Sequence, residues 1–299
     1  MKLRTKSIAV TGATGQLGRE ICRKLGPAAV PLHRHTADFN EPRKLKTILV
    51  SLRPDVVINC AAWTAVDAAE ASAKDCYAVN ADAVYELATI CNEIDSTLVQ
   101  ISTDYVYGKN QTRSVPYTET DIAGPINQYG VSKLAGEEAA SQASDHLIIR
   151  TSGLYSASEH GPVRGRNFAD TMLCLSKEFD ELRIVSDQHC TPSFVPHVAS
   201  GTIDLMQGNA RGLYNVVNMG STTWHEFTLE LLQAAGIEVP VSEITTDEYP
   251  TIATRPRFCV LNTHKFTVST GRSLPHWKTG IAEYVRLMKP HLTRMEQAA

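Results

Sequence analysis

The amino-acid sequence predicts an α/β fold, a doubly wound parallel sheet with a smaller carboxy-terminal lobe beside it. Two patterns support this prediction. Short β-rich runs alternate with amphipathic helical segments through the first half of the chain, as in a parallel sheet covered by helices on both faces. The run 146–150 has an uninterrupted apolar centre, Leu147, Ile148 and Ile149, which is typical of a strand buried on both faces.

The expected elements follow the chain in order. Strands are expected at 7–10, around Val30, and at 55–59, 97–101, 146–150, 182–185 and 213–217. Helices are expected at 17–25, 44–52, 79–94, from Tyr129 onward, and at 197–206. Ser221 is expected to open a helix to Leu232, because its hydroxyl can cap free N–H groups there. The chain from there to about Pro290 looks loop-rich, and predicts a small lobe that leaves a cleft beside the sheet.

Length, charge and cysteine usage limit the class of protein. A chain of 299 residues can bury a core without disulfides, and a formal net charge of −3 argues against a nucleic-acid binder. The seven cysteines are scattered and lack zinc spacing, so we expect them to be reduced. The chain has neither a signal-peptide pattern nor a run of about eighteen apolar residues. We therefore expect a soluble, cytoplasmic protein with no nucleic-acid and no membrane partner.

A glycine-rich turn lies between the first strand and the first helix. Its sequence is Thr11-Gly12-Ala13-Thr14-Gly15-Gln16-Leu17-Gly18. Glycines at a strand-turn-helix junction let a dinucleotide pyrophosphate approach backbone N–H groups and the positive end of the helix dipole. The spacing differs from the commoner G-x-G-x-x-G, but its place predicts an NAD(P)-binding Rossmann domain. That domain would comprise residues 1–152 with about 182–218, and a substrate lobe would comprise about 153–181 with 219–299.

The end of the second strand bears on the choice of nicotinamide cofactor. Arg34 stands there with no carboxylate before Asp38, and a basic residue accommodates the 2′-phosphate of NADPH. NADPH is therefore favoured, and NADH stays open if Arg34 only faces solvent. Asp38 and Phe39 are placed to approach the adenine, and Ala61 and Ala62 are small enough for the cofactor to cross the sheet edge.

Tyr129 and Lys133 are the candidate acid/base pair. Four-residue spacing on a helix places both side chains on one face, and a cation beside a phenol lowers the pKa of that phenol. Tyr105 and Lys109 have the same spacing, but Gly108 and the polar loop after it argue against a helix there. Thr103 follows the strand 97–101, at the sheet edge where ligands bind, and could hold a substrate oxygen beside Tyr129.

Beyond these single motifs, a series of runs resembles one family. They include Ser102-Thr103-Asp104-Tyr105-Val106 and Tyr129-Gly130-x-x-Lys133-Leu134-Ala135-Gly136-Glu137. The other matching runs are 11–12, 53–59, 64–67, 150–152, 167–173, 187–188, 222–225, 255–256 and 261–263. In order and over nearly the whole chain, they resemble the extended short-chain dehydrogenase/reductases, and most closely the dTDP-4-dehydrorhamnose reductase family.

The resemblance implies NADPH-dependent reduction of the C4 keto group of a nucleotide-linked 4-keto-6-deoxysugar, with dTDP-4-dehydro-L-rhamnose becoming dTDP-L-rhamnose. Tyr129 would protonate the alkoxide, Lys133 would bind the nicotinamide ribose and lower the Tyr129 pKa, and Thr103 would hydrogen-bond the keto oxygen. The implied cofactor-binding residues are Gly12, Thr14, Gly15, Gln16, Leu17, Gly18, Arg34, Asp38, Phe39, Ala61, Ala62, Thr64, Tyr129 and Lys133. The implied substrate-binding residues are Thr103, Asp104, Tyr105, Gly153, Asn167 and Arg255.

The chain departs from the family at Gly153, where relatives commonly carry a tryptophan that lines the sugar pocket. An indole wall is therefore expected to be absent at that position, which leaves the sugar open. Arg164 and Arg166, in a loop that looks longer than usual, could contact the nucleotide diphosphate or remain solvated. The resemblance also allows a homodimer and magnesium at its interface; Glu20 is the tentative match, and the metal stays unassigned.

Other functions on the same scaffold remain open. A 4,6-dehydratase would carry a glutamate where this chain has Tyr105, because that reaction needs a carboxylate to remove a ring proton. An epimerase usually has a serine-rich run in place of this Thr-Asp-Tyr. A non-catalytic regulatory subunit resembling that of methionine adenosyltransferase is disfavoured by the intact Thr103, Tyr129 and Lys133.

Overall fold

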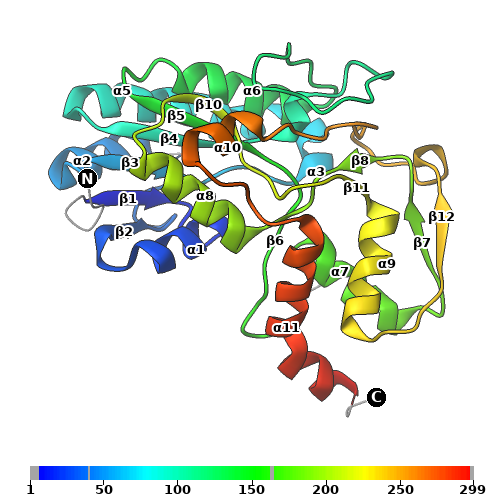
Figure 1. The fold of residues 1–299 in the computed structure, drawn as a ribbon. Helices are drawn as coiled ribbons and strands as arrows, with labels where there is room; N and C mark the ends of the chain where they lie inside the picture. The colour runs from blue at the N-terminus through cyan, green and yellow to red at the C-terminus, as the bar shows by residue number, and fades with distance from the viewer. Residues whose placement is uncertain (1–6, 40, 162–164, 297–299) are drawn as a thin grey trace.

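The computed structural model describes residues 7–39, 41–161 and 165–296. At its centre lies a six-stranded parallel sheet with the order β2-β1-β3-β4-β5-β10, so the predicted fold class is confirmed (Figure 1). The strands in that order are Ala29–Leu32, Ile8–Thr11, Val56–Asn59, Thr97–Thr103, His146–Thr151 and Gly212–Asn215. The register pairs Ile8 with Ala29 on one side and with Val56 on the other. The strand order thus reverses beside β1, which is where α/β sheets bind ligands.

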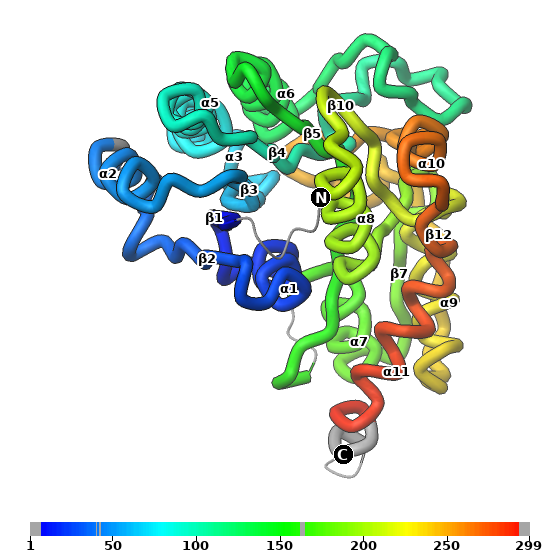
Figure 2. Tube along the Cα trace, turned by 60° about the vertical axis from the view of Figure 1, so that its left-hand side comes forward, coloured from blue at the N-terminus to red at the C-terminus, as the bar shows by residue number. Residues whose placement is uncertain are grey.

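Helices cover both faces of this sheet (Figure 2). On one face lie α1 (Gln16–Leu25) and α8 (Val195–Gln207), and α10 (His264–Thr270) packs against α8. On the other face lie α2 (Pro42–Leu52), α5 (Ala83–Ile94) and α6 (Gln128–Ala140). The short helices α3 (Val66–Ala71) and α4 (Ala73–Tyr77) lead through a π-helical turn, Ala78–Asp82, into α5. All four residues of β1 and of β3 are buried, because both faces are covered.

The smaller lobe has its own core. Three helices form it: α7 (Phe168–Glu178), α9 (Trp224–Ala235) and α11 (Trp277–Glu296). Three two-stranded sheets join them, β6 (Leu154–Tyr155) with β9 (Ser193–Phe194), β7 (Leu182–Val185) with β12 (Val241–Ile244), and β8 (His189–Cys190) with β11 (Thr222–Thr223). Of the 3-10 turns in the described residues, Thr246–Glu248 follows β12 in this lobe, whereas Gly26–Ala28 precedes β2 and Asp104–Val106 follows β4 of the main sheet. Buried aromatic side chains fill the lobe: Tyr155, Phe194, Phe227, Trp277 and Tyr284.

Three predictions about the second half were wrong, and the first concerns the strand 182–185. The strand 182–185 is not part of the main sheet, because β7 pairs only with β12 among the described strands. Its residues alternate between buried and exposed, as in a sheet with one open face, whereas β1 is buried throughout. The division into two domains stays a prediction.

The segment after 235 is also less loop-rich than expected, since α11 spans twenty residues and contains Pro290. It buries Ile281, Tyr284, Val285 and Met288 at helical spacing, and this packing outweighs the backbone hydrogen bond that proline cannot donate.

Helix α9 begins three residues later than expected. Its cap is Thr223, whose side chain accepts from the backbone N–H of Glu226, and the Glu226 carboxylate accepts from the N–H of Thr223. Ser221 is exposed and precedes this capping box, so the predicted Ser221 cap was wrong. No helix in the described ranges is both long and apolar enough to cross a membrane.

Candidate active site

The glycine-rich turn forms a cradle at the carboxyl edge of the sheet. Gly12 has a φ of 64°, and a Cβ there would lie 2.5 Å from the backbone nitrogen of Ala61. Only glycine therefore lets the turn approach β3 this closely. Helix α1 begins after Gly15 without a side-chain cap, so the first N–H groups of the helix can bind an anionic phosphate. These features fit a dinucleotide.

Two adjoining hollows extend from this cradle. One, of about 690 Å³, is lined by residues that include Thr14, Gly15, Gln16, Leu17, Gly18, Ala62, Thr64, Tyr129 and Lys133. The other, of about 570 Å³, is lined by residues that include Gly12, Thr14, Gly15, Arg34, Asp38, Phe39, Ala61 and Ala62. All the predicted cofactor residues line one or other of these two hollows, which share Thr14, Gly15 and Ala62. Arg34 is 83% exposed at its side chain and lies 3.8 Å from the Asp38 carboxylate, so its guanidinium remains accessible.

Sequence reasoning missed Thr151, the last residue of β5. Its side-chain hydroxyl is buried, lacks a hydrogen-bond partner among the described residues and lines the larger hollow. A buried hydroxyl without a partner is costly unless a ligand satisfies it. The apolar run 146–150 ends just before this residue, and that position at the carboxyl end of a strand was the available signal.

The predicted acid/base pair lies where β4 and α6 meet. Helix α6 is capped by Asn127, whose side chain accepts from the N–H of Gly130 at 2.7 Å. Tyr129 therefore lies in the first turn of the helix, and it lines the same cavities as Thr103 at the end of β4. Lys133 is buried one turn further along, and its ammonium donates to the backbone carbonyl of Ile101 at 2.6 Å.

The pKa shifts at this pair differ from the expectation. Burial raises the pKa of the Tyr129 phenol well above its ordinary value, and the influence of the nearby Thr103 side chain opposes this only in part. The predicted lowering by Lys133 was wrong for this arrangement, because the ammonium is directed at Ile101. Burial also lowers the pKa of Lys133 to about 8, while the Glu137 carboxylate opposes that shift. At neutral pH the phenol keeps its proton, as a proton donor must.

A buried ion pair holds α6 on the sheet. The Glu137 carboxylate accepts from Arg150 Nε at 2.8 Å and from Arg150 Nη2 at 2.6 Å. Ser102 donates to the same carboxylate, and Arg150 Nη1 donates to the Tyr107 hydroxyl. The pair joins α6 to β5 through its side chains, so it fixes the helix that carries Tyr129. Neither residue was predicted to belong to the site, although both stand in the family-like runs.

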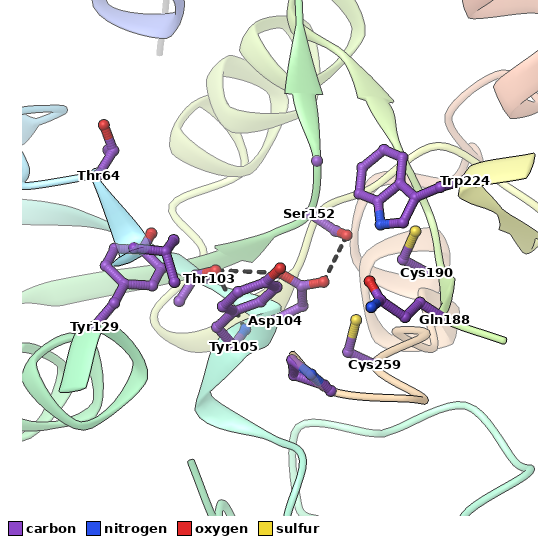
Figure 3. A pocket seen from close by; sticks show the side chains of 13 residues that line it. Thr64, Thr103, Asp104, Tyr105, Tyr129, Ser152, Gln188, Cys190, Trp224 and Cys259 are labelled. Carbon is purple, nitrogen blue, oxygen red and sulfur yellow. Dashed lines mark hydrogen bonds between the residues drawn. The ribbon is translucent and has the colours of Figure 1, made fainter. Parts of the chain in front are cut away.

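A smaller cavity of about 160 Å³ opens beside Tyr129 (Figure 3). Its lining residues are Thr64, Val66, Thr103, Asp104, Tyr105, Tyr129, Ser152, Gly153, Gln188, Cys190, Trp224, Pro256 and Cys259. Asp104 is buried there and accepts from Ser152 Oγ at 2.7 Å and from Thr103 Oγ1 at 3.1 Å. Burial raises the pKa of this carboxyl group. The cavity combines a few polar groups with apolar walls, as sites for small ligands do.

Four of the six predicted substrate residues line this cavity: Thr103, Asp104, Tyr105 and Gly153. The other two do not. Asn167 caps α7, accepting from the N–H of Asp170 at 2.8 Å, and its amide donates to Gln16. Arg255 is paired with the Asp67 carboxylate at 2.6 Å, because the loop after residue 250 folds over the start of α3.

The charged residues of the long loop and of α1 have protein partners. The Arg166 guanidinium lines the larger hollow but donates to Ser156 and to the Asp170 carboxylate. Arg164 lies outside the described residues. Glu20 is paired with Arg23 at 2.7 Å. Among the described residues, no group of three or more His, Cys, Asp or Glu side chains is placed to hold a metal.

Sequence reasoning missed most of the far wall of the small cavity. Trp224, Gln188, Cys190 and Cys259 come from the small lobe and face Thr103 and Tyr129 across the cavity (Figure 3). Trp224 and Gln188 stand in the family-like runs 222–225 and 187–188, so those runs were the available signal.

Comparison with known proteins gives consistent matches. The family model described as RmlD substrate binding domain matches residues 6–289. The dTDP-4-dehydrorhamnose reductase of Escherichia coli (strain K12) is 36% identical over 293 residues, covering 92% of this chain and 95% of that protein. The enzyme of the same name from Burkholderia thailandensis is 38% identical over 300 residues, covering 93% and 98%. The crystal structure of dTDP-4-dehydrorhamnose reductase from Bacillus anthracis in complex with NADP has a TM-score of 0.87 at 31% identity, covering 93% of this chain and 98% of that one.

Proposed function

We propose that this chain, which belongs to the RmlD substrate binding domain family, is a dTDP-4-dehydrorhamnose reductase. It reduces the C4 keto group of dTDP-4-dehydro-L-rhamnose to give dTDP-L-rhamnose. The resemblance stated from the sequence is thereby confirmed. One observation carries the proposal: Tyr129 and Thr103 both line the cofactor cleft and the small cavity, so they lie where the two meet.

Each residue has a defined task in this reaction. NADPH supplies the hydride when it is bound. Thr103 holds the keto oxygen by a hydrogen bond beside Tyr129, and the Tyr129 phenol gives its proton to that oxygen as the alkoxide forms. The carbonyl thus gains one hydride and one proton to become an alcohol. Tyr129 is left as a phenolate that takes a proton from solvent, and the Lys133 ammonium holds the nicotinamide ribose.

The choice of NADPH is supported by the NADP complex of the Bacillus anthracis relative. It is also supported by the accessible Arg34, which lines the hollow of about 570 Å³ together with Asp38 and Phe39. A cytoplasmic location is part of the proposal and is supported by seven free cysteines. The homodimer remains a prediction.

The test is an assay of the purified protein with NADPH and dTDP-4-dehydro-L-rhamnose. We expect the absorbance of the dihydronicotinamide to fall by one equivalent per sugar, and NMR to identify dTDP-L-rhamnose. Interconversion of sugar epimers without net loss of NADPH would instead identify an epimerase. Tight NADPH binding with no turnover of any 4-keto-6-deoxysugar nucleotide would favour a regulatory subunit.

A further inference from the structure

The backbone at Gly153 leaves little room for a side chain. Its φ is 48°, in the left-handed region that favours glycine. A Cβ built there would lie 3.1 Å from the Pro192 Cα and 3.1 Å from the Trp224 Cη2. The far end of the Trp224 indole thus borders directly on the position from which a side chain at 153 would extend. The aromatic wall missing at Gly153 is present, but it comes from another part of the chain.

Trp224 is held firmly in this position. It is the first residue of α9, directly after the Thr223 and Glu226 capping box. Its ring packs against Phe168 with centroids 4.3 Å apart and planes tilted by 40°, and Phe227 meets it edge-on at 6.2 Å. The preceding strand β11 pairs with β8, which carries Cys190 on the same cavity wall. A wall supported on several sides is preorganised for a ligand.

The indole also has an unused donor. No hydrogen bond joins Trp224 Nε1 to any described residue, and the ring is half-buried. Figure 3 shows Trp224 across the cavity from Tyr129, with the edge of the ring that carries the nitrogen facing the interior. Because this N–H has no partner among the described residues and is not among their buried polar atoms, it is accessible to a polar atom of a ligand. A sugar offers both an apolar face and hydroxyl acceptors.

We infer that Trp224, which forms the aromatic wall beside Gly153, is the residue that recognises the sugar in this chain. Its ring packs against the deoxysugar, and Nε1–H donates to a sugar hydroxyl on the side away from Tyr129. The inference rests on the proposed function, because it assumes a nucleotide sugar in the small cavity. It adds a specificity-determining residue on the small lobe to the acid/base pair on α6.

The test compares the affinity for a whole nucleotide sugar with that for its nucleotide alone. By calorimetry, Trp224→Ala should weaken binding of dTDP-L-rhamnose by about 10- to 100-fold, the range of a central aromatic contact. Binding of dTDP and of NADPH should stay within about twofold. Trp224→Phe keeps most of the wall but lacks the donor, so its loss should be smaller, about tenfold. Trp277→Phe, in the core of the same lobe, is the matched control and should bind like the wild type.

Equal weakening of dTDP and dTDP-L-rhamnose by Trp224→Ala would overturn the inference, as would no change in either. These binding measurements separate it from the proposed function, whose failure would appear as wild-type protein that does not oxidise NADPH. If Trp224→Ala does not fold, Trp224→Phe carries the same comparison.

A double-mutant cycle tests the link with Gly153. The Cβ of Gly153→Ala would press on the Trp224 ring, so this variant should also weaken dTDP-L-rhamnose binding. In the Trp224→Ala background the added Cβ meets no indole and only the contact with Pro192 remains, so the effect should be smaller. Strictly additive losses would show that position 153 acts independently of Trp224. Thermal unfolding of each variant checks that the cost of the strained backbone does not account for the result.

Discussion

At the scale of single residues, Tyr129 carries the proposed chemistry. Tyr129→Phe removes the proton donor but keeps the ring, so kcat should fall by about 1000-fold while NADPH affinity is unchanged. Steady-state kinetics and cofactor titration measure both. Tyr85→Phe, at an exposed tyrosine of α5, is the matched control and should retain full activity. A Tyr129→Phe enzyme with a normal kcat would remove this phenol from the mechanism.

Lys133 predicts a particular dependence of stability on pH. Its pKa falls from 10.5 to about 8 in the folded protein, so between these pH values the unfolded chain binds more protons. The free energy of unfolding therefore rises with pH in that window, and the cost of burying the ammonium is fully present below pH 8. Urea unfolding of the cofactor-free proteins measures the free energy of unfolding of the wild type and of Lys133→Met. The wild-type value should increase relative to that of the variant as the pH rises through that window. A constant difference would contradict the shift.

The sequence could predict the acid/base residues but not the sugar wall. Thr103, Tyr129 and Lys133 are identified by local spacing and by their positions after a strand and on a helix. Trp224 meets Gly153 only because two distant segments pack together, and one of them has a left-handed backbone. Periodicity contains no information about such a contact. Arg255 shows the reverse case. Its family-like run 255–256 suggested a substrate-binding residue, but in the structure its guanidinium is paired with Asp67.

At the scale of elements, the start of α9 gives a direct comparison between a predicted and an observed cap. Thr223→Ala should lower the free energy of unfolding by about 1 kcal/mol, because it leaves N–H groups at the helix start without a partner. Ser221→Ala, two residues earlier and exposed, should change it by less than about 0.5 kcal/mol. Chemical denaturation measures both. Equal effects would restore Ser221 as a cap.

The parallel sheet was predictable because strands buried on both faces have continuous apolar runs, as β1 and β3 do. The strands of the small lobe are mostly two residues long, and each pairs with a strand that is distant in sequence. Their sequences contain too few residues to show a period. Helix α11 was missed for another reason, since Pro290 indicates the end of a helix unless packing on the lobe core is known.

At the scale of the whole molecule, cofactor binding should be visible as stability. NADPH at about 100 times its Kd should raise the free energy of unfolding by about 2.7 kcal/mol. Arg34→Ala should weaken NADPH binding about tenfold, leaving about 1.4 kcal/mol at the same concentration, and should not alter NADH binding. Thermal unfolding with each cofactor measures this. Arg43→Ala, an exposed arginine of α2, is the control; equal losses for NADPH and NADH in Arg34→Ala would exclude a contact with the 2′-phosphate.

The position of β10 beside β5 has a consequence for synthesis on the ribosome. One edge of β5 pairs with β4, and the other pairs with β10. The ribosome makes β10 only after residues 152–211, which include the first half of the small lobe. At ordinary translation rates that interval lasts several seconds, during which the apolar strand His146–Thr151 has an open edge. The nascent chain is therefore most exposed to pairing with a neighbouring chain in this interval, and the arrival of Gly212–Asn215 ends it.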